Sequence, residues 1–289
     1  MSNIEISITP KDKDLGDDFI VRRSLPQIKK RMVGPFIFWD HMGPVTLSET
    51  NKMKVRAHPH IGLATITYLF SGEIMHRDSL GNEQVIRPGE VNWMTAGSGI
   101  VHSERSPEGI KLSTLEGIQL WLALPKEHEK VSPSFIHQKE KDLPLITNSG
   151  TTLRLIAGKA LDEVSPIPTY SDLFYLSGNS KKDSIFSFDL NQDQEGAIYI
   201  ISGKVKIEDQ EFVRFDMICF KQGTAINFKA LEDVSFMIFG GTPFSEGRKM
   251  WWNFVASTDE LIEQAKLNWK NDKFDKVINE DEYIPLPKF

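Results

Sequence analysis

Short apolar runs separated by turn residues recur along most of the chain, a pattern typical of β-strands. Leu63 to Phe70 is rich in β-branched and aromatic residues and ends at Ser71-Gly72, residues that commonly close a strand. Val91-Asn-Trp-Met94 is a shorter run between turns at Arg87-Pro-Gly-Glu90 and Ala96-Gly-Ser-Gly99. This strand-dense pattern predicts an all-β protein made of antiparallel barrels.

The pattern occurs twice. Tyr68-Leu-Phe-Ser-Gly-Glu73 recurs as Tyr199-Ile-Ile-Ser-Gly-Lys204, and each copy is followed by a compact apolar strand. Such an echo predicts two copies of one barrel in tandem. We therefore expect an N-terminal domain at residues 1–138, a connecting region at 139–169 and a C-terminal domain at 170–289.

Near the C-terminus the hydrophobic period changes from that of a strand to that of a helix. Ser257-Thr-Asp-Glu260 is typical of a helix start with an acidic first turn, and Leu261, Ala265 and Trp269 recur at four-residue spacing. We expect a short C-terminal helix near 257–270 whose apolar stripe packs on a barrel.

Composition narrows the class of protein. The 289 residues include 40% hydrophobic and 26% charged residues and no apolar run near eighteen residues, so we expect a globular protein without a membrane span. A net charge of -6 argues against direct binding to nucleic acid. The single cysteine, Cys219, excludes an intrachain disulfide and a cysteine metal site. With no secretory signal at the start, these features favour the cytoplasm, or the nucleus in a eukaryote.

Two short clusters carry candidate chemistry, His58-Pro-His60 and His102-Ser-Glu104. Residues two apart in a strand project to the same face, so each cluster can aim both of its polar side chains at one spot. A lone His-x-His is often structural, but two such pairs on neighbouring strands predict a mononuclear metal site. Three imidazoles and one carboxylate suit Fe, Ni, Cu, Zn or Co and leave two positions open on a six-coordinate ion.

The other histidines are placed outside this site. We expect His41 to be a hydrogen-bonded structural residue and His128 and His137 to be surface groups, whereas a place for His76 at the mouth of a pocket is left open as an alternative. The chain has no histidine after His137.

The second domain is therefore expected to lack metal ligands and to be structural or regulatory. When Gly97 is aligned with Gly223 and the shared tyrosines are used to count back, the positions that match the four ligands hold other residues: Asp189, Asn191, Phe228 and Ala230.

Three segments resemble the pirin family of the cupin superfamily, and the resemblance runs nearly end to end. They are Phe38-Trp-Asp-His-Met-Gly-Pro44, the segment from His58 to Glu73, and the long run from Met94 to Glu104. The resemblance implies two antiparallel cupin (jelly-roll) barrels in tandem. It also implies that one ion, most often Fe(II), is bound by His58, His60, His102 and Glu104; Ni, Cu, Zn, Mn and Co stay open.

The chain departs from the family pattern at two places. Ala64 and Thr65 stand where many cupins carry a glutamate ligand, so the resemblance implies that Glu104 supplies the carboxylate. Ile61 stands where pirins often have arginine.

Three functions are compatible with these features. The resemblance implies a quercetin 2,3-dioxygenase that cleaves an aromatic flavonol with O2 and releases CO, with Glu104 as the catalytic base for the flavonol 3-hydroxyl. The second is a regulatory protein, similar to a transcription cofactor, that binds a protein partner according to its metal state. The third is a cupin that binds a small ligand without oxygenase activity.

Overall fold

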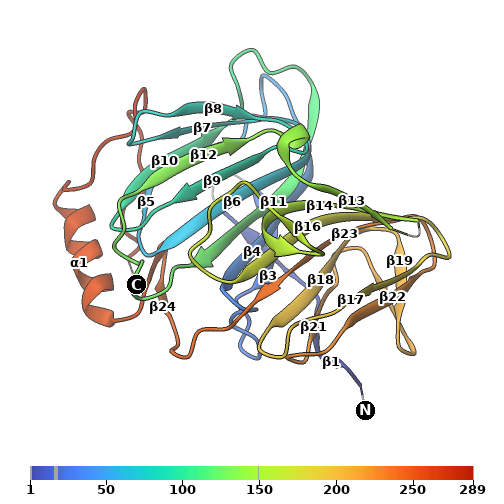
Figure 1. Cartoon of the computed structure of the whole chain (residues 1–289). Helices are drawn as coiled ribbons and strands as arrows, with labels where there is room; N and C mark the ends of the chain where they lie inside the picture. Colours follow the sequence, from blue (N-terminus) through green and yellow to red (C-terminus); the bar gives the residue numbers. More distant parts are fainter. Residues whose placement is uncertain (1, 16–18, 149, 289) are drawn as a thin grey trace. The chain divides into compact units, whose positions relative to one another are not determined.

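A computed structural model describes residues 2–15, 19–148 and 150–288 (Figure 1). The protein is mostly β, with 53% strand and 5% helix in antiparallel sheets, and the all-β prediction is confirmed. The chain divides into two compact units. The histidine-bearing unit comprises Asp12–Arg23, Trp39–Glu140 and Ser245–Phe289, and the histidine-free unit comprises Met1–Lys11, Ser24–Phe38 and Lys141–Phe244.

Strands β2 to β12 form the two sheets that carry the histidine clusters. Their bounds are β2 (Lys11–Asp14), β3 (Ile20–Leu25), β4 (Phe36–Leu47), β5 (Lys54–His60), β6 (Leu63–Ser71), β7 (Ile74–Asp78), β8 (Glu83–Ile86), β9 (Val91–Thr95), β10 (Ile100–Arg105), β11 (Ser113–Ala123) and β12 (Ser134–Gln138). The larger sheet has the order β12-β9-β6-β11-β4-β3-β2 and the smaller one β5-β10-β7-β8. Strand β6 is buried along most of its length, as its β-branched and aromatic sequence predicts.

The histidine-free unit repeats this arrangement with an apolar interior. Its strands are β1 (Ile4–Ile8), β13 (Leu145–Asn148), β14 (Thr151–Ala160), β15 (Glu163–Val164), β16 (Leu173–Ser180), β17 (Ile185–Phe188), β18 (Glu195–Ser202), β19 (Lys204–Ile207), β20 (Gln210–Val213), β21 (Met217–Phe220), β22 (Ile226–Ala230) and β23 (Val234–Gly241). They form a sheet with the order β1-β21-β18-β23-β16-β14-β13, in which β15 pairs with β14, and a second sheet with the order β17-β22-β19-β20. A short 3-10 helix, Glu140–Asp142, precedes β13.

The last segment contains a small hairpin, β24 (Lys249–Trp251) and β25 (Phe254–Ala256), followed by helix α1 (Asp259–Lys270). The predicted C-terminal helix is confirmed. Its buried residues, Ile262 and Ala265, pack with Ile61 and Phe254 of the histidine-bearing unit. The apolar stripe therefore covers a barrel, as amphipathic helices usually do.

The boundaries of the units differ from the sequential domains expected at 1–138, 139–169 and 170–289. Strand β1 pairs with β21, so the first strand of the chain completes a sheet edge of the histidine-free unit. Helix α1 belongs to the histidine-bearing unit instead of ending the second domain. The expected connecting region contains β13, β14 and β15, which are sheet strands. Charged and proline-containing flanks obscured these strands in the sequence.

The internal repeat is visible in the backbone. Gly72 and Gly203 close β6 and β18, and Gly97 and Gly223 precede β10 and β22; all four have positive φ. Only glycine adopts this conformation without cost, which explains why the same residue recurs at both sites.

One part of the predicted alignment between the halves is wrong. His58 pairs with His102 across β5 and β10, whereas Phe186 pairs with Phe228 across β17 and β22. Phe186 and Phe188, and not Asp189 and Asn191, therefore match the first histidine pair. Additional residues in the loop after β17 shifted the count. The matching position in the second barrel is filled by stacked phenylalanines, with the rings of Phe186 and Phe228 5.0 Å apart.

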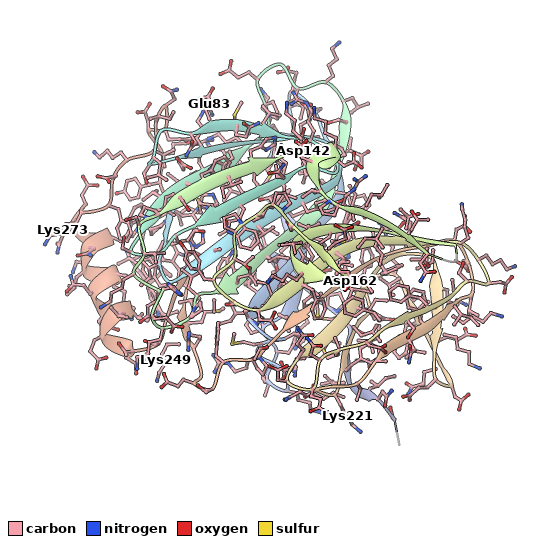
Figure 2. All side chains as sticks on the ribbon, in the orientation of Figure 1. Glu83, Asp142, Asp162, Lys221, Lys249 and Lys273 are labelled. Atoms are coloured by element: carbon pink, nitrogen blue, oxygen red, sulfur yellow. The ribbon has the colours of Figure 1, made fainter. Side chains whose placement is uncertain are left out.

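Charged side chains lie mainly at the surface, where Glu83, Lys221 and Lys249 are labelled in Figure 2. The single cysteine, Cys219, is buried. Within the described ranges, no helix is both long enough and apolar enough to cross a membrane.

Candidate metal centre

Strands β5 and β10 bring the two histidine clusters together. They pair antiparallel, with His102 opposite His58 and Ile100 opposite His60. Since alternate residues of a strand share a face, the three imidazoles project to the same side of this sheet. All three residues are buried, with exposures of 7% for His58, 1% for His60 and 1% for His102.

The three imidazoles converge on one point. Their ligand-capable nitrogens lie within 4.8 Å of one another, and Nε2 of His60 is 3.1 Å from Nε2 of His102. Nδ1 of His58 donates to the Arg56 carbonyl at 2.8 Å, and Nδ1 of His60 donates to the Asn253 carbonyl at 3.0 Å. With the hydrogen on Nδ1, Nε2 of these rings carries a lone pair.

This arrangement fits a metal ion better than it fits an apolar core. Lone pairs that face one another at short distance repel unless an electron-pair acceptor lies between them, and a transition metal is such an acceptor. Fixing the tautomer through Nδ1 is also the usual outer-shell arrangement around metal-binding histidines. The donor set therefore fits a mononuclear transition metal held by His58, His60 and His102.

Burial keeps these imidazoles neutral. Burial lowers the pKa of His58 to about 4 and lowers the pKa values of His60 and His102 well below the ordinary value of 6.5. Neutral imidazole is the form that binds a metal, so the site at pH 7 needs to release no proton from these rings when an ion binds.

The fourth predicted ligand, Glu104, lies on β10 beyond a register shift after His102. Among the described residues, the possible ligand atoms that lie within 4.8 Å of one another belong to the three histidines. No carboxylate oxygen of Glu104 is one of them. Glu104 is 6% exposed, and the Thr67 hydroxyl donates to its Oε1 at 3.3 Å. Burial raises the pKa of Glu104 to about 7. In the metal-free protein its carboxyl group therefore keeps a proton up to about neutral pH, on the same strand as His102.

The pKa of Glu104 has a consequence for stability in the metal-free protein. The ordinary value of 4.5 applies to the unfolded chain and about 7 to the folded one, so the stability that this group contributes is present below pH 4.5 and is lost as pH rises to 7. Glu104→Gln removes this dependence. We expect the stability advantage of the variant over wild type to grow by up to about 3 kcal/mol between pH 4 and pH 8. Urea unfolding of both chelator-treated proteins measures it, and a pH-independent difference would contradict the buried, protonatable carboxyl.

Glycine residues next to β5, β6 and β10 hold the clusters in register. Gly62 donates its N–H to the Gly97 carbonyl at 2.9 Å, which ties the end of β5 to the turn before β10. Gly97 has φ +51°, and a Cβ there would lie 2.0 Å from the Val131 carbonyl oxygen.

Gly97→Ala is therefore expected to lower the free energy of unfolding by at least about 3 kcal/mol, because a left-handed conformation and a backbone clash add together. Gly109→Ala is the matched control: φ is +66° and no atom lies within 4 Å of the added Cβ, so the expected cost is about 1 kcal/mol. Urea denaturation of both variants measures the difference. Equal costs would show that the Val131 contact is unimportant.

The signature segment around Asp40 and His41 is structural. Arg23 donates to both carboxylate oxygens of Asp40, at 2.8 and 2.7 Å, and Nε2 of His41 lies 3.0 Å from Oε1 of Glu116. His41 is fully buried, which agrees with the structural role expected for it. These contacts join β3, β4 and β11.

The other histidines are more enclosed than the sequence suggested. His76 is 3% exposed and lies beside His102, with ring centroids 5.3 Å apart, so it is a buried neighbour of the candidate centre. His137 is half-buried and bonds to Asn92 at 2.8 Å, and His128 is also half-buried, so neither is a free surface group.

Glu280 is a residue that no pattern in the sequence marked. Its carboxylate accepts hydrogen bonds from Oγ of Ser103 at 2.8 Å and from Nε of Arg105 at 2.6 Å, the residues on either side of Glu104. The tail also pairs with β5, since Tyr283 forms a parallel bridge with Ala57. The C-terminal tail thus holds both strands of the candidate centre from outside.

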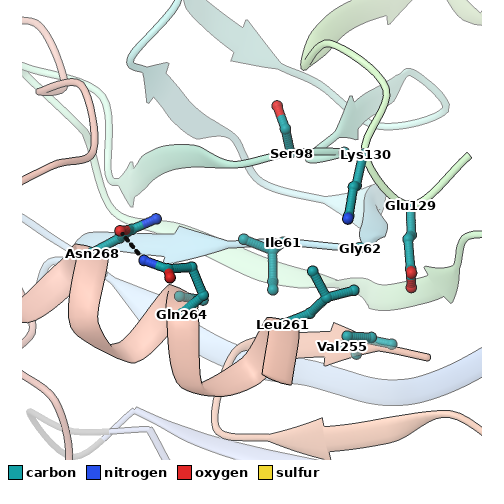
Figure 3. Close-up of a pocket in the computed structure, with 12 residues that line it drawn as sticks. Ile61, Gly62, Ser98, Glu129, Lys130, Val255, Leu261, Gln264 and Asn268 are labelled. Carbon is teal, nitrogen blue, oxygen red and sulfur yellow. Dashed lines mark hydrogen bonds between the residues drawn. The ribbon is translucent and has the colours of Figure 1, made fainter. Parts of the chain in front are cut away.

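A separate cavity of about 170 Å³ lies next to the end of β5 (Figure 3). Ile61 and Gly62, which follow His60, form one side, and Leu261, Gln264 and Asn268 of α1 form another. None of the three clustered histidines lines it. Ile61, at the position where pirins often have arginine, therefore faces the helix.

Comparison with known proteins identifies close relatives. The family model described as Pirin matches residues 18–122, and the model described as Pirin C-terminal cupin domain matches residues 175–275. A pirin-like protein of Caulobacter vibrioides is 44% identical over 99% of this chain and 100% of the relative. A quercetin 2,3-dioxygenase from Acinetobacter baumannii, solved as a crystal structure, is 31% identical in sequence. Its structure superposes with a TM-score of 0.91 and covers 98% of this chain and 95% of that chain. A bacterial pirin from Escherichia coli solved with nickel(II) shares the fold, at 19% identity and a TM-score of 0.67 over 83% of this chain and 99% of that one.

Proposed function

This chain belongs to the pirin family, and from that premise we propose that it is a mononuclear metal-dependent dioxygenase that cleaves a flavonol such as quercetin. The observation that carries the proposal is the convergence of three neutral, buried imidazoles whose nitrogens lie within 4.8 Å of one another. The similarity to a solved quercetin 2,3-dioxygenase supports the choice of reaction.

The proposed ligands are His58, His60, His102 and Glu104, with Fe(II) as the metal. Glu104 stands outside the group of three histidines but lies on the same strand as His102. When bound by these residues, a ferrous ion would supply Lewis-acid chemistry toward the substrate and dioxygen. Nickel is the main alternative, since a pirin of the same fold was solved with nickel(II).

Glu104 is the proposed catalytic base. Beside a bound cation the Glu104 carboxylate would stay ionised and could take the proton of the flavonol 3-hydroxyl, the acidic group of the substrate. The Thr67 hydroxyl lies 3.3 Å from Oε1 of Glu104 and 2.7 Å from Oε1 of Gln119, so it is a polar neighbour of the carboxylate. Loss of the proton makes the flavonol electron-rich. Addition of both oxygen atoms of O2 across the heterocycle then yields a depside and CO.

The surroundings of the imidazoles suit an aromatic substrate. The ring of Trp121 lies 5.1 Å from the ring of His60, in an edge arrangement, and Phe135 stacks on His76 at 4.4 Å. Aromatic side chains at these positions would give a flat ring system a large contact area. The lone cysteine, Cys219, is buried and needs no oxidising compartment, so we place the reaction in the cytoplasm.

Turnover of quercetin under air tests the proposal. Metal-free protein is reconstituted with Fe(II) or Ni(II), and loss of the flavonol absorbance is followed while CO is trapped. We expect one CO for each quercetin consumed, only with metal present. Metal-loaded protein that consumes no quercetin would contradict the dioxygenase. Binding of a protein partner that changes with the metal's oxidation state would then favour the regulatory alternative.

A further inference from the structure

We propose that His76 and Asp78 form a hydrogen-bonded relay that positions His102 as a metal ligand and increases its donor strength. The inference rests on the metal site of the proposed function. It adds two positioning residues to that site, and both lie on β7, next to β10.

The relay is built by strand pairing. Strand β7 pairs antiparallel with β10, with Asp78 opposite His102 and His76 opposite Glu104. Nδ1 of His76 lies 3.5 Å from Nδ1 of His102, and Nε2 of His76 lies 3.0 Å from Oδ2 of Asp78. His76 is 3% exposed and Asp78 is fully buried, so water does not compete for these contacts.

The direction of the hydrogen bonds follows from the partners of Asp78. Its Oδ1 accepts from the N–H groups of Leu80 at 2.9 Å and Asn82 at 3.1 Å, and its Oδ2 accepts from Nδ2 of Asn82 at 2.9 Å. A carboxylate surrounded by donors acts only as an acceptor, so Nε2 of His76 carries the hydrogen. Nδ1 of a neutral His76 is then an acceptor, and His102 donates its Nδ1 hydrogen to it.

This assignment leaves Nε2 of His102 with a lone pair, as in the other two rings. His58 and His60 each donate from Nδ1 to a backbone carbonyl. His102 donates instead to the His76 ring, which in turn donates to the Asp78 carboxylate. A chain that ends on an anion makes the donating imidazole a stronger ligand than a carbonyl does.

Phe135 fixes the middle of the relay. Its ring stacks on His76 with a centroid distance of 4.4 Å and an interplanar angle of 13°, which prevents the imidazole from turning away. The orientation of His76 is therefore set by packing as well as by hydrogen bonds.

Asp78→Asn tests the relay with minimal change of shape. Asparagine keeps a carbonyl oxygen for the turn around Asn82 but offers its NH2 group to Nε2 of His76. His76 must then accept there and carry its hydrogen on Nδ1, which faces Nδ1 of His102. Nδ1 of His102 must then accept this hydrogen bond, so a neutral His102 carries its own hydrogen on Nε2. Nε2 of His102 therefore no longer has the lone pair that binds the metal.

We expect Asp78→Asn to weaken Ni(II) binding by about 10- to 100-fold in a competition titration with a chromophoric chelator, the usual cost of losing an outer-shell partner. The reduction potential of the bound iron is expected to rise, because a weaker donor stabilises Fe(III) less. His76→Gln, which cannot bridge both partners, should show the same direction. Thermal unfolding of the metal-free variants checks that the fold is kept.

Glu83→Gln is the matched control, because this carboxylate lies on the same hairpin and pairs with Arg77 at the surface. It should bind Ni(II) as wild type does. Affinities within twofold of wild type for both Asp78→Asn and His76→Gln, in a wild-type protein that binds one ion, would overturn the relay and leave the metal site intact. A wild-type protein that binds no ion would overturn the proposed function and the relay together.

Discussion

Glu104→Gln is expected to lower the rate of quercetin turnover by about 10²- to 10⁴-fold, the usual contribution of a general base. Glutamine has nearly the shape of glutamate but cannot take the proton of the flavonol 3-hydroxyl. The imidazole nitrogens of the three clustered histidines lie within 4.8 Å of one another without any contribution from Glu104. The variant should therefore still bind a metal ion. Steady-state turnover with metal content measured on the same samples gives the rate per bound ion.

Glu73→Gln is a suitable control for this variant. Glu73 is exposed at the surface, where it pairs with Arg87, and it lies outside the candidate centre. Its turnover should equal that of wild type. A Glu104→Gln protein that keeps its iron and turns over quercetin at the wild-type rate would exclude the base role.

His60→Ala is expected to have a larger effect on metal binding than any change outside the ligand group. Nε2 of His60 is 3.1 Å from Nε2 of His102, and alanine leaves two imidazoles that cannot enclose an ion from three sides. Affinity for Ni(II) should fall by more than the roughly 100-fold that loss of an outer-shell partner costs. Turnover of quercetin should be undetectable.

His128→Ala controls for the loss of an imidazole as such. His128 is half-buried and lies outside the clustered nitrogens. Competition titration of both variants with a chromophoric chelator measures the affinities. Equal Ni(II) affinities for His60→Ala and His128→Ala would place the metal elsewhere.

The pairing of strands that forms the histidine group could be predicted because it depends on local rules. Side chains two apart share a face of a strand, and Gly97 sets a turn whose backbone only glycine adopts easily. His58, His60 and His102 therefore meet as their spacing predicted. The placement of Glu104 could not be predicted, since its side-chain direction depends on a register shift in β10 and on Thr67 of another strand.

Long-range features gave no sequence signal. Glu280 accepts a hydrogen bond from Ser103, which lies 177 residues earlier in the chain. Helix α1 follows the histidine-free unit in sequence but packs on the histidine-bearing unit. His76 and Asp78 were hidden for a similar reason, because their contact with His102 arises from strand pairing between β7 and β10. The false match of Asp189 and Asn191 to the ligands arose from counting across a loop whose length differs between the halves.

The most direct test of the metal centre is a crystal structure of the Ni(II)-loaded protein with anomalous diffraction recorded at the nickel absorption edge. We expect one strong anomalous peak per chain, at bonding distance from Nε2 of His58, His60 and His102. The absence of a peak there, or a peak bonded by other residues, would exclude this metal centre.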